Sequence, residues 1–268
     1  MNGIINLNLL QLLAAYLFVV LLLIIVKLKG IPREQEILIA SIRMTLQLIL
    51  TGNLLLYLFK NPSPLLTLLV LAAMEVFSIL TIIKKNKKRL SPKLKKIIAF
   101  SMSLGSVSCL FYFLLLVIQI QPWYLPQYFI PIAGMLIGNS MTGISLGVNR
   151  LLDGFEGEKH LIEGALMLGA SPKVAAKQVV SRAFDASILP TINSMVGMGI
   201  VFLPGMMTGQ ILSGTSPTTA IEYQIAIMLG ILGSVSLTVI LFLQLGYRAF
   251  FNEKDQLIEE PYTTPFPQ

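Results

Sequence analysis

The chain has 268 residues, of which 55% are hydrophobic and only 12% are charged. A soluble domain carries about 25% charged residues, so the composition excludes an ordinary soluble enzyme, and we expect no nucleic-acid partner despite the net charge of +7. The chain contains one cysteine, Cys109, and one histidine, His160. These counts exclude an intramolecular disulfide, a CxxC pair and an HExxH metal site. We therefore expect an all-α polytopic membrane protein, embedded in the lipid bilayer and without catalytic residues.

The apolar stretches predict seven transmembrane helices. Each has roughly the 20 mostly apolar residues that a spanning helix needs, and their limits are 5–26, 37–59, 64–83, 97–118, 124–148, 188–212 and 219–247. Cytoplasmic loops of membrane proteins collect Lys and Arg. If the N-terminus lies outside, all Lys and Arg residues except Arg43 and Lys60 fall in inner loops or in the inner tail. The sequence thus predicts a multi-pass protein of the inner (plasma) membrane, with its N-terminus outside and its C-terminus inside.

These helices form a single transmembrane domain, which we place at residues 1–252. The tail at 253–268 is polar and contains prolines. Segments of this composition cannot bury enough apolar surface to fold, so we expect the tail to be a disordered cytoplasmic segment.

Two charged residues lie well inside the predicted spans, whereas Glu222 lies in the first turn of the last one. Arg43 in the second span and Glu75 in the third lie about 10–13 Å from the inner ends of antiparallel neighbours, at 1.5 Å per residue. A charge inside a spanning helix costs about 2.5–3.5 kcal/mol, and a pair at matched depth costs less. One interpretation is a buried ion pair that fixes helix register. The other is that Glu75 takes part in a cation path while Arg43 keeps it ionised.

The fifth span combines small residues with polar ones. Gly134 and Gly138, and again Gly143 and Gly147, have the spacing of four that lets helices approach closely. Asn139 in this span, and Asn193 in the sixth, lie among such residues. The pattern predicts either close helix packing alone, or a dimer seam or central translocation path bordered by the two asparagines.

The loop at 150–187 is the longest between two spans and predicts a cytoplasmic helical hairpin. A first helix over about 155–168 ends at Gly169, a favourable residue just after a helix. Ser171 is then an N-cap, and Pro172 is the first residue of a second helix.

The turn of this hairpin resembles a known coupling element. The segment EGALMLGAS, from Glu163 to Ser171, is similar to the EAA-type loop with which permeases of ABC transporters dock on their ATP-binding subunits. The resemblance assigns ATPase coupling to a set of small residues and one acidic residue: Glu163, Gly164, Ala165, Gly169, Ala170 and Ser171. The alternative is an ordinary hairpin between two spans.

The sixth span contains helix-breaking residues in FLPGMMTGQILSG (202–214). Pro204 removes a backbone N–H and Gly205 loosens the helix. Freed backbone groups at membrane depth must be buried in protein or face a wet cavity. We therefore predict a bend that lines the outer part of a passage, with Met206, Met207 and Gln210 just beyond it. Core packing of the two methionines is the alternative.

A wider set of segments strengthens the resemblance. GMLIGNSMTGISLGVNR (134–150), LPTINSM (189–195), LPGMMTGQILSG (203–214) and YQI (223–225) follow one another in the order found in the FetB family of ABC permeases. Bacterial members of that family are described as iron exporters, and plant relatives are tied to aluminium tolerance and nucleotide-sugar movement. Membership implies a homodimer joined to two separate ATPase subunits. Because the chain lacks a GxxxxGK[ST] motif, ATP and magnesium would be bound by the partner, and this chain would bind no cofactor.

The sequence thus predicts the permease subunit of an ABC exporter that works by alternating access, with iron or another metal ion as cargo. It identifies no metal ligands. An importer permease, an ABC permease for an organic anion or a nucleotide sugar, and a stand-alone secondary transporter or channel are the alternatives. The last would be expected to show two related halves, and no such repeat is visible.

Overall fold

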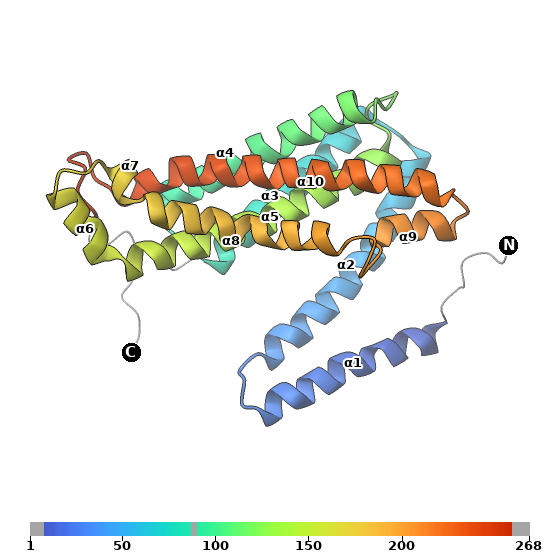
Figure 1. The fold of residues 1–268 in the computed structure, drawn as a ribbon. Helices are drawn as coiled ribbons and strands as arrows, with labels where there is room; N and C mark the ends of the chain where they lie inside the picture. The colour runs from blue at the N-terminus through green and yellow to red at the C-terminus, as the bar shows by residue number, and fades with distance from the viewer. Residues whose placement is uncertain (1–7, 87–89, 259–268) are drawn as a thin grey trace.

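The computed structural model describes residues 8–86 and 90–258, and these fold as helices joined by short loops (Figure 1). The helices that run along the length of the molecule are α1 (Leu9–Leu28), α2 (Glu34–Lys60), α3 (Pro64–Lys85), α4 (Pro92–Tyr112), α5 (Pro126–Gly157), α8 (Lys177–Gly197) and α10 (Pro217–Gly246). The shorter ones are η1 (Phe113–Val117), α6 (Lys159–Met167), α7 (Pro172–Ala175), α9 (Gly205–Leu212) and η2 (Tyr247–Phe250). The expectation of an all-α protein is confirmed for the described residues.

Six helical segments in the described part of the chain are long and apolar enough to cross a membrane. They are Leu9–Leu28, Glu34–Lys60, Pro64–Lys85, Pro92–Val117, Pro126–Gly157 and Pro217–Phe250. They agree with six of the seven predicted spans. The predicted sixth span, 188–212, is not one helix, because α8 ends at Gly197 and α9 begins at Gly205.

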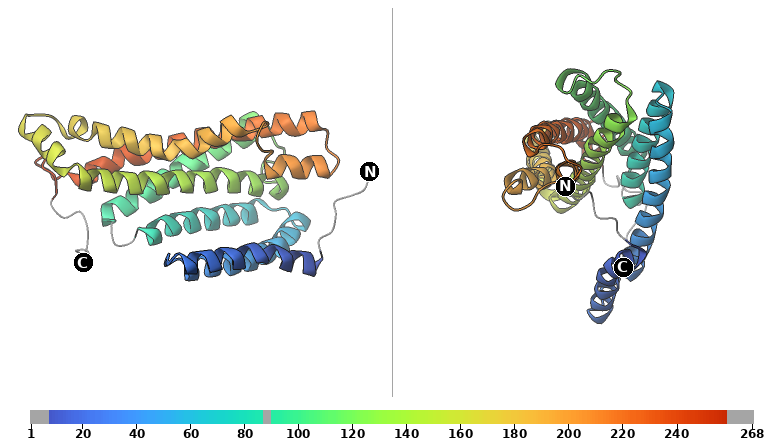
Figure 2. Two further views of the ribbon diagram at one scale, coloured as in Figure 1. Left: turned by 60° about the horizontal axis from the view of Figure 1, so that its bottom comes forward. Right: turned by 90° about the vertical axis from the view of Figure 1, so that its right-hand side faces the viewer.

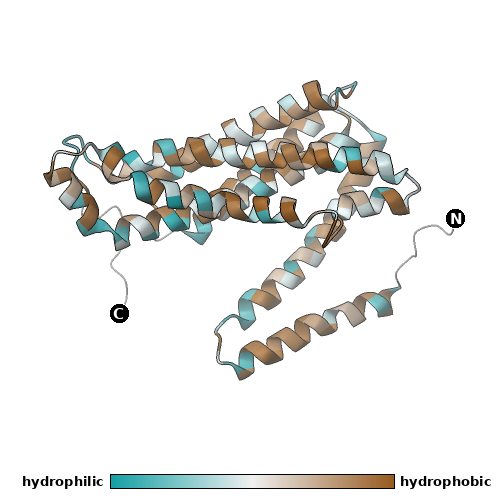
Figure 3. Cartoon of the chain, viewed as in Figure 1, coloured by the Kyte–Doolittle hydropathy of each residue, from teal (hydrophilic) through white to brown (hydrophobic). Residues whose placement is uncertain are grey.

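Helices α4, α5 and α10 form the centre of the bundle, and α3 and α8 pack on its sides (Figure 2). The buried core follows the inner faces of these five helices and continues into η2. The hairpin of α1 and α2 leans away from this bundle (Figure 1). Helix α1 is apolar along nearly its whole length (Figure 3) and almost entirely exposed in the single chain. These two helices are therefore suited to contact lipid or another protein chain rather than the core.

Several glycines lie at close helix approaches, and three of them show how the bundle is packed. A Cβ atom at Gly143 would lie 2.8 Å from Val235 Cγ1 of α10, and one at Gly147 would lie 2.6 Å from Ser187 Oγ of α8. On the other side of the bundle, a Cβ at Gly105 would lie 2.7 Å from the Cα of Thr238. The 143–147 motif is thus used within the chain, as small residues at this spacing allow.

The other predicted motif behaves differently. A Cβ at Gly134 would meet only the end of Met74, at 3.5 Å, and one at Gly138 would meet nothing within 4 Å. This part of α5 remains open on the outside of the single chain.

Helix α5 continues far beyond the predicted end of the fifth span at residue 148. Its 32 residues are about 48 Å long at 1.5 Å per residue, whereas the hydrocarbon core is about 30 Å thick. The ring of Phe155 stacks on that of Phe250, with centroids 4.0 Å apart. The bundle core thereby extends into the region predicted as a separate hairpin, and much of 150–187 belongs to the ends of α5 and α8.

The chain after η2 folds back on itself. The N–H of Ile258 donates to the carbonyl of Phe250 at 2.9 Å, and Asn252 accepts from the backbone of Lys254 and Gln256. Residues 253–258 therefore form a turn, although we expected disorder from 253 onward, and the side chain of Asn252 is the local reason. The rest of that tail, 259–268, lies outside the described residues.

Candidate functional site

The predicted coupling turn lies at one end of the molecule, between α6 and α7 (Figure 1). Gly169 follows α6 with φ of 87°. Its N–H donates to the carbonyl of Leu166 at 2.9 Å, and the N–H of Ala170 donates to that of Ala165 at 3.0 Å. This pair of bonds is a Schellman motif, which requires a residue in the left-handed region. Ser171 then occupies the N-cap of α7 in an extended conformation, as predicted.

The tip of this turn presents apolar side chains to the surroundings. Met167 is 87% exposed and Leu168 is 90% exposed. Both lie beyond Gly157, the end of α5, whose 32 residues already exceed the length that a membrane crossing needs. An exposed apolar patch outside the membrane indicates a protein contact. We call Met167, Leu168 and the Gly169–Ser171 turn the apolar knob.

Glu163, the acidic residue of the predicted motif, points along α6 rather than toward the tip. Its carboxylate lies 3.7 Å from Lys159 Nζ and 4.0 Å from His160 Nδ1. A second ion pair, between Arg182 of α8 and Glu158, joins the other side of the knob to the bundle. Glu163 thus stabilises the helix that carries the knob, and Gly164 and Ala165 supply the small backbone positions of its last turns.

Asn139 and Asn193 lie at nearly the same height on neighbouring antiparallel helices. A Cβ at Gly143 of α5 would lie 3.5 Å from the carbonyl oxygen of Ser187 of α8. From this level Asn139 is about 6 Å along α5, and Asn193 is about 9 Å along α8 in the same direction. Both asparagines are exposed in the single chain. Asn139 satisfies one of its N–H groups on the carbonyl of Met135, at 2.7 Å. The structure therefore places two amides at membrane depth on the outer surface of the bundle, and it does not bring them into contact.

The helix break begins earlier than predicted. Helix α8 ends at Gly197, and residues 198–204 form a loop closed by a hydrogen bond of 3.0 Å from the N–H of Gly199 to the carbonyl of Phe202. Pro204 is the N-cap of α9 and Gly205 its first residue. The predicted bend at Pro204 is therefore wrong in position, because Met198 is already extended, with ψ of 134°, and ends the helix, and Gly199 follows with a positive φ of 82°.

The break lies close to the end of the bundle opposite α6 and α7 (Figure 1). Met198 Sδ is 3.8 Å from Nε2 of Gln224, which is seven residues, or about 10 Å, from the start of α10. Two loop residues, Ile200 and Val201, are 90% and 80% exposed. Irregular backbone near membrane depth requires a covering of protein or water. In the single chain, the side chains of Ile200 and Val201 have no such cover of protein.

The three predicted gate residues of α9 have different surroundings. Met207 is buried and Met206 packs against the core, which agrees with the packing role that we considered for them. Gln210 is half-buried, and its carbonyl accepts from Ser213 Oγ at 2.8 Å and from the N–H of Thr215 at 3.0 Å. Their side chains thus hold α9 beside the first turns of α10.

Arg43 and Glu75 do not form the ion pair that their matched depth suggested. The guanidinium of Arg43 lies 5.2 Å from the ring centroid of Phe77. Glu75, only 6% exposed, accepts a hydrogen bond from Ser106 of α4, and its Oε2 has no partner. Glu75 and Phe77 are two residues apart and therefore face nearly opposite sides of α3. Matching depth in the membrane could not specify how α3 is rotated about its own axis.

This geometry predicts different effects for two substitutions. Arg43→Leu removes only a cation–π contact, worth about 0.5–1 kcal/mol at an exposed site, so the protein should remain folded. Ser106→Ala removes the only partner that the structure gives to the buried carboxyl, and such losses cost about 1–3 kcal/mol. Thermal unfolding of the purified variants in detergent measures both effects. A larger loss of thermal stability for Arg43→Leu than for Ser106→Ala would contradict the geometry.

Two residues of the knob were not singled out from the sequence, although they lie within the quoted motif. Met167 and Leu168 are adjacent large apolar residues directly before a turn glycine in the long loop between two predicted spans. That combination is the signal that could have identified them. Among the described residues, no group of three or more His, Cys, Asp and Glu side chains could hold a metal ion.

Three relatives illustrate what the chain is similar to. It is 38% identical to the UPF0014 membrane protein slr1647 of Synechocystis over 86% of this chain and 88% of that one. It is 32% identical to the protein named probable iron export permease protein FetB of Escherichia coli, over 91% of this chain and 92% of that one. It is 34% identical to the protein ALUMINUM SENSITIVE 3 of Arabidopsis thaliana, over 91% and 88%. No solved structure matches the chain.

A family model supports the same relationship. The model of the uncharacterised protein family UPF0014 matches residues 9–251, which include all the helices described above. FetB and ALUMINUM SENSITIVE 3 are similar to this chain over nearly the same length, so the family predicted from its sequence segments is confirmed. The chain therefore belongs to the UPF0014 family of membrane proteins.

Proposed function

We propose that the chain is the membrane permease subunit of an ABC exporter, driven by a separate ATP-binding subunit that docks on the apolar knob. The exposure of Met167 and Leu168 beyond the membrane-length helices is the observation that carries this proposal. A groove on an ATPase would bury these side chains, and the Schellman turn keeps them in one orientation. ATP and magnesium would be bound by that partner, and this chain would contribute no catalytic group. The relative named as an iron export permease supports iron or another metal ion as cargo.

The same proposal includes seven crossings. Helices α8 and α9 would together form one discontinuous crossing, broken at 198–204. The start of α1 and the end of α10 lie at opposite ends of the molecule (Figure 2), as an odd number of crossings requires. Because Lys and Arg collect in cytoplasmic loops, the end that carries α6 and α7 would be cytoplasmic, in the plasma membrane.

The active unit would be a homodimer. The open face of α5 near Gly138, the amide of Asn139 and the exposed loop around Ile200 all need cover at membrane depth. A second copy would provide it and would enclose a passage between the two chains. Asn139 and Asn193 would then border this passage, with α9 and Gln210 at its outer end.

A crosslinking experiment tests the docking. Cysteine at position 168, in a Cys109→Ala background, should crosslink to the ATPase subunit when the two are expressed together. The matched control is cysteine at position 212, since Leu212 is also exposed but lies at the opposite end. We expect a crosslinked product for position 168 and none for 212, in both the presence and absence of ATP. Equal products, or none with 168, would reject the docking site.

A second candidate cargo follows from the same surface. The polar side chains on the open faces of α5 and α8 are amides and hydroxyls, including Asn139, Thr142 and Asn193. Such groups hydrogen-bond to the oxygen atoms of organic molecules, which favours an organic anion or a nucleotide sugar. Reconstitution with the ATPase distinguishes the cargoes, because only a transported compound should stimulate ATP hydrolysis.

A further inference from the structure

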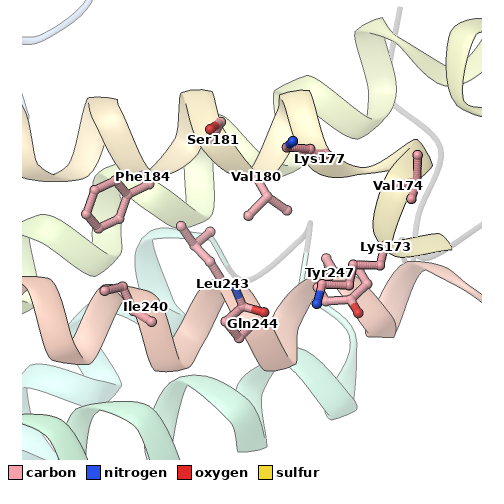
Figure 4. Close-up of a pocket in the computed structure, with 10 residues that line it drawn as sticks. All are labelled: Lys173, Val174, Lys177, Val180, Ser181, Phe184, Ile240, Leu243, Gln244 and Tyr247. Carbon is pink, nitrogen blue, oxygen red and sulfur yellow. The ribbon is translucent and has the colours of Figure 1, made fainter. Parts of the chain in front are cut away.

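A crevice separates α8 from α10 at the end of the bundle that carries the knob. It has a volume of about 610 Å³. Its walls are formed by Lys173, Val174, Lys177, Val180, Ser181 and Phe184 on one side, and by Ile240, Leu243, Gln244 and Tyr247 on the other. Figure 4 shows Val180 and Phe184 of α8 and Leu243 of α10 directed into the space between the two helices.

The crevice is polar at one end and apolar at the other. Phe184 and Ile240 lie toward the middle of the bundle, whereas Lys173 and Lys177 lie near its end (Figure 4). Both lysines are exposed, and the structure gives neither of them a carboxylate partner. Ser181 and Gln244 add a hydroxyl and an amide between the two regions. The apolar part of the crevice is suited to acyl chains, and the basic part is suited to lipid headgroups.

A second cavity continues from the basic end. It has a volume of about 750 Å³ and shares Lys173 and Tyr247 with the crevice. Lys93 and Arg248 bring two more positive charges to it, while Glu253 and Asp255 bring two negative charges on its outer side. An anionic group would therefore be attracted to the side of Lys173 and Lys177, and repelled from the side of Glu253 and Asp255.

We infer that this crevice is a binding site for an anionic phospholipid, with the phosphate between Lys173 and Lys177 and an acyl chain along Phe184 and Ile240. Basic pockets between transmembrane helices bind anionic headgroups at the cytoplasmic side. A zwitterionic lipid would fill the apolar part equally well, but it would gain less from the two lysines. The inference is independent of the cargo and of the ATPase.

The occupant would connect two parts of the molecule that lie far apart in the sequence. Lys173 belongs to α7, directly after the knob, and Gln244 and Tyr247 belong to the end of α10 and to η2. A bound lipid would hold the knob against α10 and make the stability of this end dependent on lipid composition.

Native mass spectrometry of the full chain in mild detergent tests the site. Dioleoyl phosphatidylglycerol and dioleoyl phosphatidylcholine, which share their acyl chains, would be titrated separately. One lysine near the membrane surface contributes a factor of about five to the binding of an anionic lipid, so two should give a preference of about 25-fold for phosphatidylglycerol. Equal affinity for the two lipids would overturn the inference.

Variants locate the binding within the chain. The double variant Lys173→Gln, Lys177→Gln should lose the preference, whereas Lys27→Gln, Lys29→Gln should keep it, although both remove two positive charges from the predicted inner side. Ile240→Trp should weaken both lipids together because it narrows the apolar part. An unchanged preference in the first variant, or loss of preference in the control, would place the lipid elsewhere and contradict the site.

Competition with the headgroup alone distinguishes a lipid site from a site for a small anion. Glycerol phosphate at millimolar concentration should not displace phosphatidylglycerol, since it cannot occupy the apolar part of the crevice. Displacement at that concentration would identify an anion site without a lipid. If the ATPase protected the Lys173 amine from chemical labelling and phosphatidylglycerol did not, the surface would instead belong to the ATPase contact.

Discussion

Replacing Leu168 with aspartate is expected to abolish ATP-driven transport while leaving the membrane protein folded. The side chain is 90% exposed and touches no part of the core, so the substitution should not change the stability of the isolated chain. In a complex with the ATPase, the carboxylate would take the place of an apolar group. Burying a Leu side chain contributes about 1.5–3 kcal/mol, so we expect binding of the ATPase to weaken by at least about tenfold.

Co-purification and ATP-dependent transport in vesicles measure this effect. Leu212→Asp is the matched control for co-purification of the ATPase, because Leu212 is also an exposed leucine but lies at the far end of the molecule. Transport by Leu168→Asp at the wild-type rate, with the ATPase bound normally, would show that the knob is not the docking point.

Replacing Gly105 with alanine is expected to destabilise the bundle by about 1–3 kcal/mol, the range for overpacked cores. The new Cβ would lie 2.7 Å from the Cα of Thr238. That atom belongs to the backbone of α10, so a change of rotamer cannot relieve the contact, and the two helices must separate. Separation would also disturb the neighbouring hydrogen bond between Ser106 and Glu75.

Gly233→Ala is the matched control on α10, since a Cβ there meets nothing within 4 Å. Thermal unfolding of both variants in the same detergent gives the comparison. We expect a clear loss of thermal stability for Gly105→Ala and none for Gly233→Ala. Equal stability of the two variants would contradict the close approach of α4 and α10.

The parts of the fold that follow from local chemistry could be predicted from the sequence. Apolar length located six helices, and the Gly169–Ser171–Pro172 order located the end of α6 and the start of α7. Both signals depend on residues that are near one another in the chain. They require no knowledge of which helices are neighbours.

Features that depend on helix rotation could not be predicted in this way. Arg43 and Glu75 have matching depths, yet the turn of α3 directs Glu75 to Ser106 and leaves Arg43 on Phe77. Similarly, the break was expected at Pro204, whereas the extended backbone of Met198 ends α8 earlier. The crevice between α8 and α10 is formed by residues about 60 positions apart, and no sequence spacing indicates it.

The continuity of α5 has a mechanical consequence. The helix passes without interruption from Pro126 to Gly157, and its tight crossings at Gly143 and Gly147 leave no room for it to slide against α8 and α10. A push on the end that carries the knob would therefore tilt the helix as a rigid lever about these crossings. Its two ends would then move in opposite directions. In the proposed permease, narrowing of the passage at one end would widen it at the other, and both openings would not be wide at the same time.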